Sequence, residues 1–124
     1  MTCADCEGRT LSLAVPESYR EFADDATVTV CRTCLTVTSG GDGTDEPDDV
    51  ADAIPGGDPG VGVCLLCGLL ESVATNRAAI EGLVARMERD GVDVLLVLDR
   101  IAADPDLDPA IDVARRRRVV EQLA

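Results

Sequence analysis

The chain has 124 residues, which is enough for one ordinary domain or two very small ones. It contains no histidine, so the commonest general base and the commonest nitrogen ligand for metals are both excluded. With no tryptophan, one tyrosine and one phenylalanine, any core must be aliphatic, and the formal net charge of −13 indicates a strongly acidic surface.

The basic residues are all arginine: 11 of them stand against 24 acidic residues, and lysine is absent. This balance resembles that of proteins from a salt-saturated cytoplasm. Strong salt screens the repulsion between carboxylates, because the Debye length is about 3 Å at 1 M, and hydrated carboxylates keep such a protein soluble. We therefore interpret the acid excess as a mark of a halophilic habitat rather than of a basic partner.

The opening stretch, MTCADCEGRT, lacks the apolar core of a secretory signal. No window reaches the roughly 18 uninterrupted apolar residues that span a bilayer. We expect a cytoplasmic protein with no membrane partner. In a reducing cytoplasm, paired cysteines are more often metal ligands or redox groups than disulfides.

Residues 1–38 have the pattern of a small sheet. RTLSLAV alternates between apolar and polar residues, and the β-branched runs TVTV and LTVT flank the second cysteine pair. Between these runs, PESYREFA predicts one short helical turn that begins at Pro16. We expect its two aromatic residues, Tyr19 and Phe22, to cover the sheet.

Four cysteines of this region form two CxxC pairs: Cys3 with Cys6, and Cys31 with Cys34. Two such pairs can bring four thiolates to the corners of a tetrahedron around Zn²⁺, and Gly8 would allow the tight turn after the first pair. A segment this short buries too little to fold unaided, whereas a structural zinc contributes on the order of 10 kcal/mol. The spacing therefore predicts one zinc ion per chain.

Other uses of these four thiols remain open. The same site could hold iron, as in rubredoxin-like electron carriers, although those usually surround the metal with aromatic side chains. The pairs could also be redox dithiols, although the βαβ context of thioredoxin-like proteins is missing, or unliganded buried thiols. A catalytic zinc is disfavoured because four thiolates leave no position for water. We predict no catalytic residue and do not expect an enzyme.

Residues 39–62 are rich in glycine, proline and aspartate. Such a composition buries little apolar surface and is typical of a disordered linker. We interpret its aspartates as solvated charge.

Residues 63–124 have the pattern of about three helices. Apolar residues recur at steps of three and four from Val63 to Met87, and Gly91 stands where a helix C-cap is expected. VDVLLVLDRIAA predicts a second helix. A third would begin with Asp108 as N-cap and Pro109 in the first turn. Short connections suggest a small bundle, or half of a bundle shared by two chains.

The third CxxC pair, Cys64 and Cys67, has two interpretations. Leucines on both sides favour small apolar residues of a helix that face the core. Alternatively, these thiols from two chains could share a second metal ion at a dimer interface. The number of metal ions per chain would separate the two cases.

Arg115, Arg116, Arg117 and Arg118 form the one basic cluster. Four consecutive helical residues spread around most of the helix and cannot form a single face. Near a helix C-terminus they favour a dipole-stabilised or ion-paired role, with contact to nucleic acid as the alternative. The acidic N-terminal region itself is a poor surface for nucleic acid.

Several stretches of the chain together form a recognisable pattern: the CxxC pairs with CRTCL, the acidic segment, and the runs LLESVATNRAAIEGLVARMERDGVD and LDRIAADPDLDPAIDVARRRRVVEQL. Together they resemble a family of small uncharacterised haloarchaeal proteins described as related to zinc fingers and of unknown function. The resemblance covers both ends of the chain but not the acidic segment. It implies a zinc ribbon with a helical tail, with Cys3, Cys6, Cys31 and Cys34 as ligands, and it implies no activity, substrate or partner.

We therefore predict an α+β protein with three parts: a zinc ribbon (1–38), an acidic disordered linker (39–62) and a helical module (63–124). The function we expect is that of a non-catalytic adaptor, with exposed ribbon loops carrying ADCE and RT, and with a protein partner or self-association through the helices. The alternatives are nucleic-acid binding through Arg115–Arg118 and a rubredoxin-like or dithiol redox role.

Overall fold

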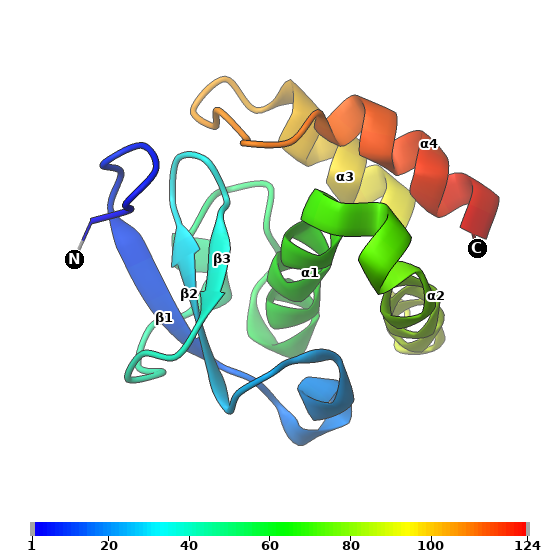
Figure 1. Ribbon diagram of the computed structural model, residues 1–124, viewed down its shortest axis with the longest axis horizontal. Helices are drawn as coiled ribbons and strands as arrows, with labels where there is room; N and C mark the ends of the chain where they lie inside the picture. Colours follow the sequence, from blue (N-terminus) through cyan, green and yellow to red (C-terminus); the bar gives the residue numbers. More distant parts are fainter. Residues whose placement is uncertain (1, 124) are drawn as a thin grey trace.

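The computed structural model describes residues 2–123. An antiparallel sheet of three strands forms the N-terminal part, and four α-helices follow it (Figure 1). The strands are β1 (Thr10–Ala14), β2 (Thr27–Cys31) and β3 (Val37–Ser39); the helices are α1 (Gly57–Leu69), α2 (Val73–Arg89), α3 (Val94–Ala103) and α4 (Val113–Leu123). Three short 3₁₀ segments complete the chain: η1 (Glu17–Phe22), η2 (Pro47–Asp49) and η3 (Leu70–Ser72). The predicted α+β class is confirmed.

The sheet buries one face because its strands alternate as the sequence predicts. The strand order is β1-β2-β3, and the pairing sets Leu11 opposite Val30 and Leu13 opposite Val28. These four side chains are buried, and all four helices lie on their side of the sheet (Figure 1). The opposite face carries threonines, as expected for a sheet covered on one side.

The acidic segment 39–62 is ordered, so the prediction of a disordered linker is wrong. Thr44 forms a β-bridge with Leu13, and two apolar residues of the segment, Val50 and Ile54, are buried in the core. The segment is therefore fixed at both its strand-like start and its middle, and its acidic side chains remain in solvent except Asp45, which is half-buried and accepts a hydrogen bond from the Ser12 N–H. Helix α1 then begins at Gly57, earlier than the predicted boundary at residue 63.

The stripe from Val63 to Met87 belongs to two helices. Helix α1 ends at Leu69, the turn η3 changes the chain direction, and α2 follows; the described helices are four rather than about three. Residues 60–67 are all buried, so α1 is a central helix that is enclosed on every side. The amphipathic stripe predicted from the sequence describes α2. It does not describe α1, which is apolar on every side.

The other helix ends follow capping chemistry, with one correction. Gly91 follows α2 with a positive φ of 86°, as predicted, and the Asp93 carboxylate accepts a hydrogen bond from the Leu96 N–H at the start of α3. Helix α4, however, begins at Val113 and not at Pro109, with Asp112 accepting from the Arg115 N–H. The residues before it are held elsewhere, because the N–H groups of Asp108 and Ala110 donate to the carbonyls of Thr33 and Cys34.

Both halves of the chain share a single hydrophobic core that contains strand and helix residues alike. The turn η1 lies between the two halves. Tyr19 packs against Gly62 of α1 and donates a hydrogen bond of 2.9 Å from its hydroxyl to the Asp90 carboxylate. Tyr19 therefore fills the space between η1 and the helices. We had predicted that it covers the sheet, and that prediction is wrong.

The run from Gly57 to Arg89 is long and apolar enough to cross a membrane, judged by length and composition alone. Its most apolar window is 39% buried inside the protein, and the turn η3 interrupts it. The enclosed position of α1 accounts for this composition.

Candidate metal centre

The first cysteine pair forms a tight turn, the first knuckle (residues 3–8). The Cys3 N–H donates to the Gly8 carbonyl over 2.7 Å, and the Glu7 N–H donates to the Cys3 carbonyl over 2.9 Å. The turn closes through Glu7, which has a positive φ of 63°. We had assigned this role to Gly8, so that assignment is wrong. Gly8 is needed for another reason: a Cβ there would lie 2.9 Å from the Cys31 Sγ.

The second pair repeats this geometry in the second knuckle (residues 31–36). The Cys31 N–H donates to the Thr36 carbonyl, and the Leu35 N–H donates to the Cys31 carbonyl, both over 3.1 Å. Leu35 has a positive φ of 58° and stands at the position of Glu7 in the first knuckle. Neither residue is the glycine that usually marks such a turn, so the clue in the sequence is only their equal offset from the cysteines.

The two knuckles bring four thiols together. The Sγ atoms of Cys3 and Cys34 lie 3.7 Å apart, those of Cys6 and Cys31 lie 3.5 Å apart, and all four lie within 4.8 Å of one another. A regular tetrahedron with Zn–S bonds of about 2.3 Å has S–S edges of about 3.8 Å. The four cysteines therefore fit a single tetrahedral ion such as Zn²⁺, and the shortest contacts run between the knuckles.

Hydrogen bonds to sulfur prepare the site for thiolates. The N–H groups of Thr33 and Cys34 point to the Cys31 Sγ at 3.4 and 3.5 Å. The backbone N–H of Gly8 lowers the pKa of Cys6, but hydrogen bonds with the Cys31 and Cys34 thiols outweigh it and raise that pKa to about 12. Without a cation the Cys6 thiol thus keeps its proton at neutral pH, and a bound cation would supply the charge that releases it.

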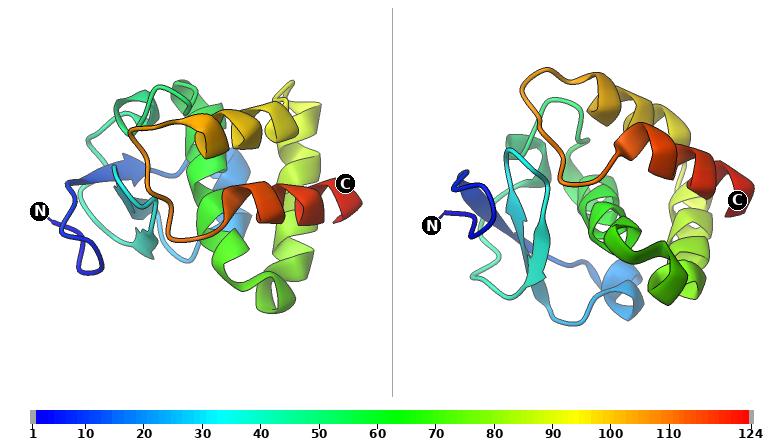
Figure 2. Two further views of the ribbon diagram at one scale, coloured as in Figure 1. Left: turned by 90° about the horizontal axis from the view of Figure 1, so that it is seen from above. Right: turned by 45° about the horizontal axis from the view of Figure 1, so that its top comes forward.

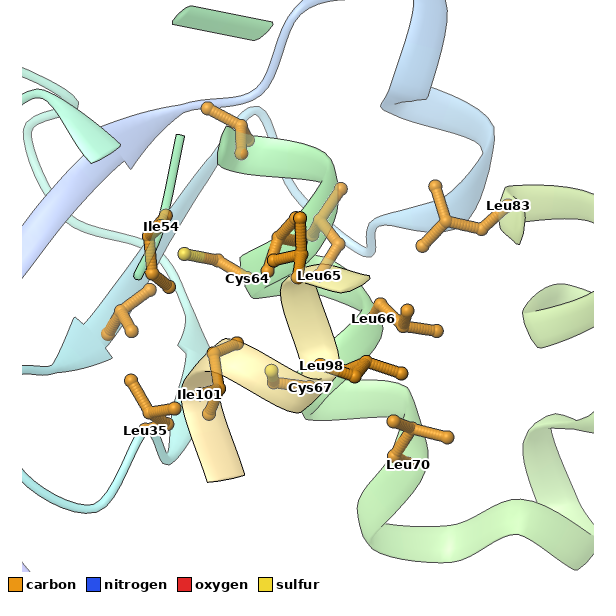
Figure 3. Close-up of a cluster of buried hydrophobic side chains, with 14 of the residues drawn as sticks. Leu35, Ile54, Cys64, Leu65, Leu66, Cys67, Leu70, Leu83, Leu98 and Ile101 are labelled. Carbon is orange, nitrogen blue, oxygen red and sulfur yellow. The ribbon is translucent and has the colours of Figure 1, made fainter. Parts of the chain in front are cut away.

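The two knuckles differ in how firmly the protein holds them. The second is anchored: its Thr33 and Cys34 carbonyls accept hydrogen bonds of 2.8 and 2.9 Å from the N–H groups of Asp108 and Ala110, in the connector between α3 and α4. Its Leu35 is buried and belongs to the hydrophobic core, which Figure 3 shows with side chains of α1 and α3. In the first knuckle, residues 4–7 are exposed, including Cys6. We had predicted that both loops face a partner, but the connector covers part of the second.

The third cysteine pair lies inside α1 and apart from the four-thiol cluster. Figure 3 shows Cys64 and Cys67 among the leucines of the core, and both are buried. Burial, followed by the charge of Glu71, raises the pKa of Cys67 to about 12; burial, followed by Cys67, raises the pKa of Cys64. These protonated thiols pack as small apolar side chains.

The arginine run lies on α4. Arg117 forms ion pairs with Asp99 of α3, at 2.9 Å, and with Glu121 one turn along α4. Arg115 and Arg118 are exposed, and Arg116 is half-buried. The central arginine thus helps to fix α4 against α3.

The fold and the site define an α+β protein in which two matching CxxC knuckles place four thiols around one point. Residues 2–124 match the model of a family of unknown function, DUF6276, and the chain belongs to that family. No curated protein and no solved structure matches the chain significantly. The four-thiol site is therefore the feature of the molecule that indicates its function.

Proposed function

We propose that this protein is a non-catalytic cytoplasmic adaptor whose ribbon is folded around one Zn²⁺ ion and binds a protein partner. The observation that carries the proposal is the cluster of four Sγ atoms within 4.8 Å, built by two knuckles with the same hydrogen bonds. Four cysteine ligands complete a tetrahedral zinc site and leave no position for a reacting water, which favours a structural role.

The knuckle contacts explain why such an ion would matter beyond the ribbon. The ion would join the exposed first knuckle to the second, which is bonded to the α3–α4 connector through Asp108 and Ala110 and to the core through Leu35. Metal binding would then stabilise the sheet and the connector together, because binding free energy adds to folding free energy. The first knuckle, with Asp5 and Glu7 in solvent, remains available to a partner.

Metal analysis and spectroscopy of one sample test the proposal. We expect one zinc ion per chain, a colourless protein, and loss of the dispersed amide spectrum when a strong chelator removes the ion. Cys3→Ser is expected to abolish zinc binding, whereas Cys64→Ala, which removes a thiol outside the cluster, should keep it. A red, iron-containing protein or a spectrum that survives complete metal removal would contradict a structural zinc site.

A further inference from the structure

We propose that the open edge of strand β3 docks an extended segment of a partner protein, apolar and basic in character, as a fourth strand of the sheet. This inference rests on the proposed adaptor function and names the surface and the kind of partner. It follows from the two edges of the sheet, which differ sharply, and from the hollows that flank one of them.

The edge formed by β1 is closed by the chain itself. Thr44 forms a bridge with Leu13, the Asp45 N–H donates to the Ser12 carbonyl over 2.8 Å, and the Ser12 N–H donates to the Asp45 carboxylate over 2.9 Å. These contacts use the backbone groups that a further strand would need. Closing an edge in this way is a common protection against unwanted pairing.

The edge formed by β3 has no such cover. The Cys31 N–H donates to the Thr36 carbonyl and the Gly40 N–H donates to the Thr27 carbonyl, so alternate residues, including Thr38, face β2. The backbone groups of Val37 and Ser39 therefore point away from the sheet. Within residues 2–123, no hydrogen bond from outside the sheet reaches β3.

A hollow lies on the inner side of this edge, between β3 and the helices. Its volume is about 210 Å³, and we call it the inner hollow. Phe22 of η1, Val37 of β3 and Leu69 of α1 line it, and all three side chains are only half-buried. Half-buried apolar side chains around a hollow gain from an apolar group that covers them.

A second hollow, the outer hollow, lies on the opposite face of the sheet, extends from β1 to β3, and has a volume of about 310 Å³. Thr29, Thr36 and Thr38 line it together with Asp5 of the first knuckle. The candidate metal site thus forms one wall of this hollow. The close-packed helices are on the other side of the sheet (Figure 2), so the outer hollow is open to a partner.

The alternation of a strand fits the two hollows. Residues directly opposite one another in a sheet point to the same face. Partner residues opposite Val37 and Ser39 would enter the inner hollow, whose lining combines apolar side chains with Ser39 and Asn76, and the residue opposite Thr38 would face the outer hollow with its threonines. Recognition by strand addition combines main-chain hydrogen bonds with pockets for alternate side chains in this way.

The charges that line the two hollows favour a different protein, rather than a second copy of this chain, as the occupant. Asp24 lines the inner hollow and Asp5 the outer one, and among the described residues no arginine lines either. Two copies paired through β3 would bring these aspartates together at one interface. A segment with flanking arginine or lysine residues would instead be attracted.

The probe for a test is the synthetic peptide acetyl-RRVTVRR-amide, titrated into the zinc-loaded full chain. We expect saturable binding, with amide shifts at Val37–Ser39, Phe22 and Leu69. Methylating the backbone nitrogens of both valines removes the donors that face β3 but keeps the charge, and it should weaken binding at least about tenfold. Methylating the threonine nitrogen, which faces solvent, should have a much smaller effect.

Variants of the chain give the matching test. Ser39→Pro removes an outward N–H and is tolerated on an edge strand, so it should lose peptide binding, whereas Leu96→Ala, at an exposed position of α3 that lines neither hollow, should keep it. Zinc content and spectral dispersion are recorded on every sample. No binding by a folded, zinc-loaded chain, equal binding of both methylated peptides, or self-association through β3 without peptide would overturn the docking proposal. Absence of zinc would instead overturn the proposed function.

Discussion

Replacing Leu35 tests how the second knuckle is anchored. Two effects oppose each other at this position: the side chain is 5% exposed and packs in the core, but its backbone has a φ of 58°, which disfavours any residue except glycine. Leu35→Ala removes the packing and keeps the strain, so it should lower the free energy of unfolding by about 2–5 kcal/mol. Leu35→Gly removes both, and should be more stable than Leu35→Ala by about 1 kcal/mol.

The first knuckle provides the matched control. Glu7 has the same backbone conformation, with a φ of 63°, but its side chain is exposed. Glu7→Gly should therefore raise the stability by up to about 1 kcal/mol, because it relieves the strain at no cost in packing. The same change from a side chain to glycine should thus have opposite signs in the two knuckles.

Equilibrium unfolding in denaturant, followed at constant free zinc, measures all three variants. The reasoning about Leu35 would be refuted by an alanine variant within about 1 kcal/mol of the parent, since removal of a buried leucine costs more than that. A strongly destabilised Glu7→Gly would refute the claim that the turns close through these two residues.

Three other changes probe the site and its surroundings. Gly8→Ala should weaken zinc binding, because the new methyl group would lie 2.9 Å from a ligand sulfur, and competition with a chromophoric chelator measures the loss. Burial, followed by the charge of Asp5, raises the pKa of Glu71 in the folded protein. The free energy of unfolding should therefore fall as the pH rises above the pKa that Glu71 has in the unfolded chain. Glu71→Gln should melt at a higher temperature than the parent at pH 7 and at the same temperature at low pH. Cys64 and Cys67, buried and with raised pKa values, should resist iodoacetamide in the native protein and react on unfolding, as peptide mapping would show.

The ribbon could be predicted because its rules are local. Alternation of apolar residues set the strands, and the CxxC spacing selected the four thiols that meet in space. The closing residue of the first knuckle could not be predicted in this way. Glycine is the usual residue with a positive φ, whereas the turn uses Glu7 and reserves Gly8 for close approach to the other knuckle.

The rest depended on contacts between distant segments. Composition made the acidic segment look disordered, but Val50 and Ile54 anchor it because the sheet and α1 leave room for two apolar side chains there. Asp108 and Pro109 are good residues for a helix start, yet α4 begins later because the Asp108 N–H is bonded to the Thr33 carbonyl. Local preference gave way in both places to a partner far away in the chain.

The enclosed position of α1 has a practical consequence for anyone who wishes to dissect this protein. A cut before Val63, at the boundary that composition suggests, would split α1. This helix packs against the buried face of the sheet and lies at the centre of the helical layer. Each fragment would then expose apolar surface that is buried in the intact chain, and it would aggregate or reassociate with the other fragment. The cysteine ribbon is therefore not a portable module, and its chemistry has to be studied in the intact polypeptide.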